Sequence, residues 1–216
     1  MPRKTQFTPD EIIDAAYAMV KEKGWEGLSV TAVAKRIGAS TMPIYSYFEN
    51  LEKLKDAVVI RGWENLMAYQ TQTYTGDVWI DQSIAYINFA KDEKRIFYCM
   101  FDGRNLALQR QINRKHWDCL GDFLEGYGGF KGLSEEEIFL IRYSRAMFSH
   151  GLAMSVTSNL GALLTAKGIV EHLSTAVSRA VLKGYKTQYD IEDPTFAFLD
   201  REIKKIGKTQ DTGKEP

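Results

Sequence analysis

The distribution of proline constrains the fold of this chain more than any other feature of its sequence. The 216 residues contain five prolines, and none of them lies between Pro43 and Pro194. Proline inside a helix removes a hydrogen bond and clashes with the preceding turn, so this long stretch is free to be helical. No alternation of apolar and polar residues bounded by hairpin turns indicates β-strands. The sequence therefore predicts an all-α fold.

Residues that favour helix ends divide the chain into helical segments. Thr8 and Glu11 have the spacing of a capping box, and Gly24 is placed to end the helix that follows. Asn50 is the expected N-cap of a long helix over 51–74. The other helices that apolar periodicity predicts lie at 30–37, 41–47, 78–92, 94–101, 105–125, 135–158 (after a second capping box at Ser134), 162–188 and 195–206.

Composition and charge exclude several classes of protein. Apolar residues make up 44% of the chain and charged residues 26%, values that are typical of a globular protein. Twenty-eight basic residues balance 28 acidic ones, which argues against a protein that coats polyanions but permits a local basic surface. Cys99 and Cys119 cannot form a disulfide framework, no apolar run is long enough to cross a bilayer, and no secretory signal follows Met1. We therefore expect a cytoplasmic protein that does not enter membranes.

Residues 29–48 have the pattern of a helix-turn-helix. Two short helices, which Ser29 and Ser40 can cap, are separated by a turn at Gly38, and a longer helix precedes them. Apolar residues at helical spacing can form a small core, which leaves the polar and aromatic residues for a DNA groove and its phosphates. The expected core residues are Leu28, Val33, Ala34, Ile37, Ile44 and Phe48.

The stretch from Gly24 to Leu54 resembles the DNA-binding domain of the TetR (tetracycline-repressor-like) transcriptional regulators. The rest of the chain matches this family only in architecture. The resemblance implies a helix-turn-helix domain at 1–50 and a helical regulatory and dimerisation domain at 51–206, which the helix over 51–74 connects to it. The polar tail at 207–216 is expected to be disordered. The residues that carry the resemblance are Gly24, Gly27, Leu28-Ser29-Val30, Val33-Ala34, Ile37-Gly38-Ala39-Ser40, Ile44-Tyr45, Tyr47-Phe48 and Leu54.

The resemblance also implies which residues contact DNA. Ser29 and Thr31 lie where the family touches the DNA backbone or a base edge, and Thr41 lies in the first turn of the recognition helix, where bases are read. Thr41 offers a hydroxyl and a methyl group, whereas Met42 and Pro43 offer apolar surface that suits thymine methyl groups. The expected DNA-binding residues are Ser29, Thr31, Ser40, Thr41, Met42, Pro43, Tyr45, Tyr47 and Lys53.

Phosphate binding depends on a few neutral donors and cations. Tyr45 and Tyr47 match an aromatic pair whose hydroxyls can bond phosphates, although one of them can instead belong to the core. The family often has a lysine at the start of its fourth helix, where this chain has Leu51, and Lys53 or Lys55 can compensate. The first 62 residues carry nine basic and eight acidic side chains, so the affinity for DNA must depend on few cations.

The C-terminal part is rich in aromatic and methionine side chains. The resemblance implies a chamber for an unknown small hydrophobic or aromatic ligand, although the same residues at helical spacing can simply form a core. His116 and Cys119 have the spacing of two metal ligands but lack a third, so neither a metal site nor a cofactor is expected. The candidate ligand-binding residues are Trp63, Met67, Tyr86, Phe101, His116, Trp117, Tyr143, Met147 and His150.

Small residues along the helix over 162–188 favour close packing against another helix. The family dimerises through its last two long helices, which here correspond to 135–158 and 162–188, and a palindromic DNA operator requires two reading heads. The alternative is that this stripe packs inside one subunit. The stripe consists of Ile169, Leu173, Ala176, Ala180 and Gly184.

These features predict a homodimeric repressor of transcription that a small ligand releases from a palindromic operator. No spaced nucleophile and base or metal signature indicates an enzyme. Two alternatives are a small-molecule enzyme that uses His116 and His150, and a protein-interaction module that does not bind DNA, which the unusual Leu51 would fit. Repressors and activators of this kind are not distinguished by their residues.

Overall fold

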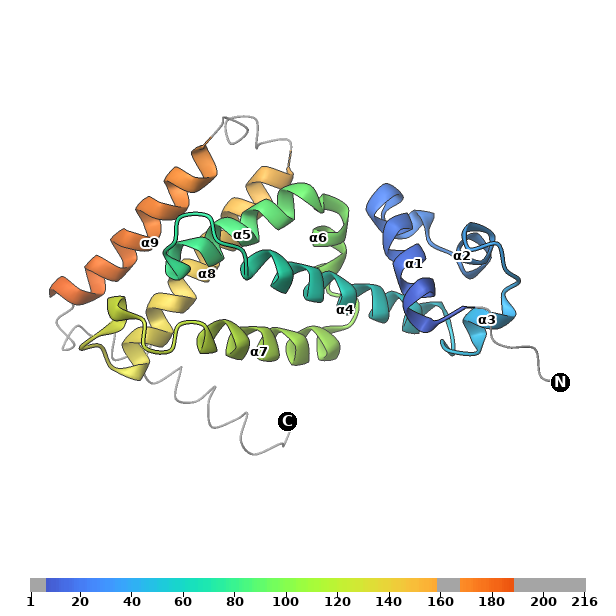
Figure 1. Cartoon of the computed structure of the whole chain (residues 1–216), viewed down its shortest axis with the longest axis horizontal. Coiled ribbons are helices and arrows are strands. Elements are labelled where there is room, and N and C mark those ends of the chain that lie inside the picture. Colours follow the sequence, from blue (N-terminus) through green and yellow to red (C-terminus); the bar gives the residue numbers. More distant parts are fainter. Residues whose placement is uncertain (1–6, 159–167, 189–216) are drawn as a thin grey trace.

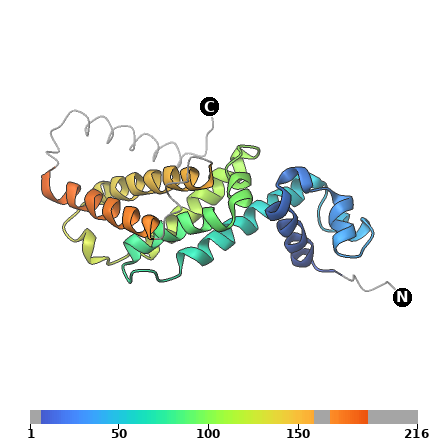
Figure 2. The ribbon, with the colours of Figure 1, turned by 90° about the horizontal axis from the view of Figure 1, so that it is seen from above.

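The computed structural model describes residues 7–158 and 168–188, and all regular structure in these two ranges is helical. The all-α prediction is confirmed. Helices α1–α3 stand at one end of an elongated molecule, α5–α9 form a bundle at the other end, and α4 runs from one to the other (Figures 1 and 2). The elements are α1 (Pro9–Lys23), η1 (Trp25–Gly27), α2 (Val30–Arg36), α3 (Met42–Tyr45), α4 (Leu51–Gln70), α5 (Val78–Asp92), α6 (Lys94–Met100), α7 (Leu106–Asp122), η2 (Gly128–Phe130), α8 (Glu135–Thr157) and α9 (Ile169–Gln188).

The predicted capping residues begin the helices as expected. The Thr8 hydroxyl accepts a hydrogen bond from the Glu11 amide at 3.2 Å, and the Glu11 carboxylate accepts one from the Thr8 amide at 2.7 Å. Ser134 and Glu137 repeat this reciprocal pair at the start of α8, with the same two distances. The Asn50 side chain caps α4. Each such cap stabilises its helix by about 1 kcal/mol.

The prediction that Ser40 caps the recognition helix is wrong. Helix α3 begins one residue later, with Thr41 at the N-cap position, and no side chain caps it. Thr41 has helical backbone angles, with φ −73° and ψ −17°, whereas a capping side chain needs an extended backbone at its own residue. Helix α3 is therefore a single turn held by its neighbours.

Helix α4 ends at Gln70, before the predicted residue 74. The chain then turns around the buried side chain of Asp81, whose carboxylate accepts hydrogen bonds from the amides of Thr75 at 2.7 Å and Gly76 at 3.2 Å. The other predicted helices are confirmed apart from shifts at their ends. The predicted segments 162–167, 195–206 and 207–216 lie outside the described residues.

One buried apolar cluster links the two ends of the molecule through α4. Near its start α4 contributes Leu54, which packs in the same cluster as Ile12 of α1 and Ile44 of α3. Further along, Trp63 and Leu66 join the buried side chains of α5 and α6 in that cluster. Burying each side chain of this size contributes about 1.5–3 kcal/mol, so α4 is held firmly by both parts. No helix within residues 7–158 and 168–188 has an apolar run that could cross a membrane.

Polar contacts fix α8 against α5. The guanidinium of buried Arg145 lies 3.7 Å from the centre of the Trp79 ring and donates a hydrogen bond to Gln82 Oε1 at 2.9 Å. One turn further along α8, the hydroxyls of Ser149 and Ser83 lie 2.8 Å apart. These contacts hold one face of α8 in the bundle and leave its opposite face outward.

Candidate functional site

Helices α2 and α3 form the predicted helix-turn-helix. The Ser29 hydroxyl caps α2 by accepting a hydrogen bond from the Ala32 amide at 3.1 Å. Gly38, in the turn, has a φ of 69°, in the left-handed region that favours glycine. Val33 of α2 and Ile44 of α3 are buried against α1 and α4, which fixes the angle between the two short helices. We call this unit, from Trp25 to Phe48, the reading head.

The reading head exposes large side chains that a packed core would hide. Met42 is 75% exposed and Tyr45 is 55% exposed, and both belong to the single turn of α3. Tyr47 is also exposed, and its hydroxyl donates to the Phe7 carbonyl at 3.2 Å, so neither tyrosine is a core residue. The other predicted DNA-binding residues are also accessible: Ser29, Thr31, Ser40 and Lys53 are exposed, and Thr41 and Pro43 are half-buried.

The structure distinguishes the two lysines that can compensate for Leu51. The side chain of Lys55 is only 16% exposed and its ammonium lies 2.7 Å from Glu52. The side chain of Lys53 is 59% exposed, and its nearest carboxylate, that of Asp56, is 4.0 Å away. Lys53 is therefore the better placed of the two to reach a phosphate.

Other cations of the N-terminal part differ in their availability. The Arg36 guanidinium makes two hydrogen bonds with Glu22 of α1, at 2.7 and 2.9 Å, and this contact keeps the pKa of the Glu22 carboxyl below its usual value. Lys35 is exposed and makes no ion pair with any described residue. The positive charge that the reading head offers is therefore small and local.

Five of the nine candidate ligand-binding residues meet inside the helical bundle. The ring of Trp63 lies 4.9 Å from that of His116 and 5.4 Å from that of Phe101, measured between centroids. The Phe101 ring lies 4.9 Å from His150, and the Tyr86 hydroxyl is 2.8 Å from His150 Nδ1. We call this set the aromatic cluster, together with fully buried Phe97, which was not among the nine and lies 4.9 Å from Phe101.

Burial keeps the aromatic cluster uncharged at neutral pH. Desolvation lowers the pKa of His116 to about 4, lowers the pKa of His150 and raises the pKa of Tyr86. His116 Nδ1 and Trp63 Nε1 are buried, and neither finds a hydrogen-bond partner among the described residues. Buried polar atoms without partners are uncommon and costly. Residues 7–158 and 168–188 contain no group of three or more His, Cys, Asp or Glu side chains that could hold a metal ion.

The other four candidate residues lie apart from the aromatic cluster. Trp117 and Tyr143 pack their rings around Phe139 near the outer surface of α7 and α8. Tyr143 and Met147 are exposed on α8, and Met67 is half-buried on α4. Tyr143, Met147 and His150 are spaced by four and three residues along α8, but only His150 points into the aromatic cluster.

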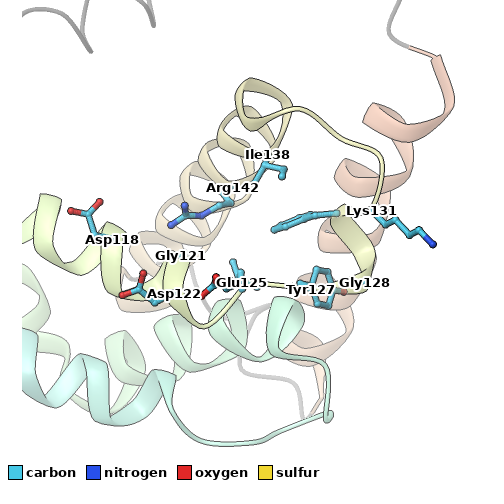
Figure 3. Close-up of a pocket in the computed structure, with 12 residues that line it drawn as sticks. Asp118, Gly121, Asp122, Glu125, Tyr127, Gly128, Lys131, Ile138 and Arg142 are labelled. Atoms are coloured by element: carbon cyan, nitrogen blue, oxygen red, sulfur yellow. The ribbon is translucent and has the colours of Figure 1, made fainter.

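The structure also has an open cleft that none of the nine candidates lines. Its volume is about 980 Å³, and it lies between the end of α7, the loop around η2 and the start of α8 (Figure 3). Asp118 and Asp122 face it from α7, and Arg142 faces it from α8. This charged surface cleft differs from the enclosed apolar chamber that the sequence predicts.

Comparison with known proteins agrees with the architecture of the reading head and the bundle. Residues 12–58 match the family model of the bacterial regulatory proteins of the tetR family. The uncharacterized HTH-type transcriptional regulator YvdT of Bacillus subtilis is 22% identical over 94% of this chain and 98% of its own. The uncharacterized HTH-type transcriptional regulator Rv0681 of Mycobacterium tuberculosis is 24% identical over 74 residues, and this match spans only about a third of either protein.

A solved structure shows the same fold. A transcriptional regulator from Rhodococcus sp. Rha1 aligns with a TM-score of 0.64 and 20% identity, over 82% of this chain and 97% of its own. Residues 12–58 therefore match the tetR family of bacterial regulatory proteins, and the chain shares the fold of a solved transcriptional regulator.

Proposed function

We propose that this protein is a DNA-binding regulator of transcription that represses as a homodimer on a palindromic operator and is released by a small hydrophobic or aromatic molecule. The exposure of Met42 and Tyr45 on a single helical turn is the observation that carries DNA binding. Large apolar and aromatic side chains held in solvent by a rigid scaffold mark an interaction surface. Because the DNA of a bacterium lies in its cytoplasm, a bacterial regulator that binds DNA functions there.

The chemistry of the reading head favours contact with bases through few side chains. Thr41 and Met42 meet base edges in the major groove, with Met42 against thymine methyl groups. The hydroxyls of Ser29 and Tyr45 donate to phosphates, and Lys53 contributes the nearest ammonium. Because most of these donors are neutral, binding will weaken with salt less than it does for strongly basic DNA-binding proteins.

Dimerisation explains the outward faces of the last two helices. On α8 the side chains of Tyr143, Met147 and Met154 are exposed, and on α9 the small residues Ala176 and Ala180 are exposed. A second copy of the chain is the occupant that fits, because two reading heads must meet half-sites that lie about 34–36 Å apart along DNA. The isologous contact places each of these faces against its symmetry mate.

Ligand control operates between the aromatic cluster and the reading head. The first turn of α4 adjoins α3 (Figure 1), and further along α4 the buried side chains of Trp63 and Leu66 pack in the bundle. A ligand that binds best when α4 is tilted changes the separation of the two heads. Such coupling typically amounts to about 1–3 kcal/mol, and operator DNA must weaken ligand binding by the same factor.

Two substitutions in the reading head are expected to weaken operator binding in different ways. Thr41→Ala removes a base contact and will cost roughly 1–3 kcal/mol per contact, mainly at particular base positions. Tyr45→Phe removes a phosphate donor and will weaken binding to all sequences alike. Fluorescence anisotropy with variant duplexes measures both effects. Tyr98→Phe, at an exposed tyrosine of α6, is the matched control. Parental affinity in both reading-head variants would show that α3 does not read DNA.

The experiment that tests the proposed function is selection of bound duplexes from random DNA by the purified full-length protein. We expect enrichment of an inverted repeat. A folded protein that enriches no sequence would instead favour a protein-interaction module, and ligand binding without DNA binding would favour the enzyme alternative.

A further inference from the structure

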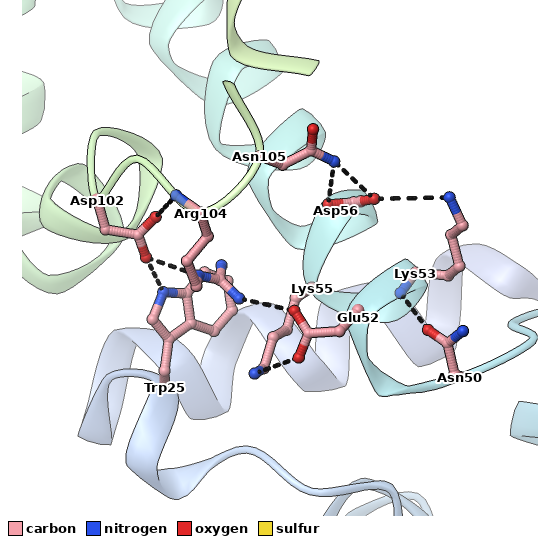
Figure 4. A network of polar contacts seen from close by, with 9 residues as sticks. All are labelled: Trp25, Asn50, Glu52, Lys53, Lys55, Asp56, Asp102, Arg104 and Asn105. Carbon is pink, nitrogen blue, oxygen red and sulfur yellow. Dashed lines mark hydrogen bonds and ion pairs between the residues drawn. The ribbon is translucent and has the colours of Figure 1, made fainter. Parts of the chain in front are cut away.

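The turn that joins α6 to α7 contacts the aromatic cluster and the reading head with neighbouring residues. The ring of Phe101 packs on Trp63 and His150 inside the bundle. The carboxylate of the next residue, Asp102, accepts a hydrogen bond from the indole Nε1 of Trp25 at 2.6 Å (Figure 4). Two adjacent residues, Phe101 and Asp102, therefore connect the aromatic cluster to Trp25.

Three further contacts strengthen this connection. The Arg104 guanidinium lies 4.0 Å from the centre of the Trp25 ring and donates to Asp102 at 2.8 Å and to Glu52 at 3.3 Å (Figure 4). Charge-assisted hydrogen bonds and a stacked guanidinium give this contact a defined geometry. We call Trp25, Glu52, Asp102 and Arg104 the interdomain latch. Trp25 lies four residues before Ser29, so the latch holds the segment that leads into α2.

Two buried hydrogen-bonding atoms of the aromatic cluster, Trp63 Nε1 and His116 Nδ1, have no partner among the described residues. Trp63 Nε1 can only donate, whereas the neutral His116 ring can accept or donate at Nδ1, depending on its tautomer. Both atoms are buried, and the two rings lie 4.9 Å apart. Phe101 is only half-buried and belongs to a turn, so its ring is the part of the cluster that can move with the least rearrangement.

We propose that a neutral aromatic ligand with one hydrogen-bonding oxygen or nitrogen replaces the Phe101 ring against Trp63 and His116, and that the displaced turn releases the interdomain latch. The inference rests on the proposed function and specifies its ligand class and its route to DNA. The ligand is aromatic because its neighbours make edge-to-face ring contacts. It is neutral because the cluster is uncharged, and a buried charge without a partner is strongly unfavourable.

The ligand class is tested by opening the site. Phe101→Ala is titrated by calorimetry with phenol, and with benzene as the probe that lacks the hydroxyl. We expect phenol to bind this variant at least ~10-fold more tightly than it binds the parent, and ~10-fold more tightly than benzene does, because a site with unpaired polar groups rejects an analogue that leaves them unpaired. His116→Phe in the same background should remove the preference for phenol.

Two controls keep this test decisive. Phe123→Ala removes an exposed phenylalanine at the end of α7 and should create no phenol site. If Phe101→Ala does not fold, Phe101→Leu opens a smaller space in the same place, and the same preference is expected. Equal binding of phenol and benzene, or no binding to either folded variant, would overturn the ligand class.

The route to DNA is tested by a double-mutant cycle on operator binding. Trp25→Phe keeps a ring beneath Arg104 but removes the N–H that bonds Asp102. We expect Phe101→Ala to lower operator affinity about fivefold or more in the parent, within the usual range of allosteric coupling, and less than ~2-fold in the Trp25→Phe background. Independent effects of the two substitutions would overturn the latch. If the parent enriches no DNA, the proposed function fails, whereas the phenol test still decides the ligand class.

Discussion

We expect replacement of Ala180 with glutamate to convert the proposed dimer into a monomer that has lost operator binding. Ala180 is exposed on α9, one turn after Ala176, where the proposed interface allows close approach of two helices. In a twofold dimer each glutamate would lie in the buried contact near its own symmetry mate, and a buried charge without a partner costs several kcal/mol. Loss of the second reading head removes an avidity gain of roughly 10²–10⁴.

Sedimentation equilibrium and anisotropy measure the two consequences of Ala180→Glu. The matched control is Gln111→Glu, which adds the same charge at an exposed position of α7 and should leave both mass and affinity unchanged. A variant at Ala180 that keeps the mass of a dimer would place the interface on another surface.

Acidification is expected to destabilise the protein through His116. Its pKa is about 4 in the folded state because of burial, and 6.5 in the unfolded chain. The unfolded state therefore binds a proton more readily than the folded state does. The contribution of His116 to the free energy of unfolding is fully present above pH 6.5 and declines as the pH falls towards 4. At 1.36 kcal/mol per pKa unit the loss is about 3 kcal/mol. Burial of His150 acts in the same direction.

Urea unfolding at pH 7, 5.5 and 4.5 isolates this contribution when the parent is compared with His116→Gln. The variant should lose most of the additional acid sensitivity, whereas carboxylates contribute equally to both proteins. His172→Gln, at an exposed histidine of α9, should behave as the parent does. Identical pH profiles of the parent and His116→Gln would mean that His116 is not desolvated in the folded protein.

Local signals predicted the fold because helix ends depend on residues close in sequence. The capping box of Thr8 and Glu11 and the N-cap at Asn50 involve contacts over only three residues. The premature end of α4 was not predictable in this way. It depends on the Asp81 side chain, which reaches back from α5 to satisfy the turn at Thr75.

The candidate site was predictable where exposure follows from a short motif and less so where it depends on tertiary packing. Met42 and Tyr45 stand in solvent as the helix-turn-helix pattern indicates. By contrast, helical spacing puts Met147 and His150 on one side of α8, but Met147 is exposed on the outer surface and His150 belongs to the aromatic cluster. The contact of Trp25 with Asp102 joins residues 77 positions apart, and no local pattern marks it.

The most direct test of the account is the affinity of the full-length protein for the selected inverted repeat and for a scrambled duplex, titrated with salt. We predict a preference of ~10³-fold or more for the repeat, as specific DNA-binding proteins show. We also predict a linear fall of log affinity with log salt whose shallow slope reflects few phosphate contacts. Equal, weak binding of both duplexes by a correctly folded dimer would contradict the claim that the reading head recognises DNA.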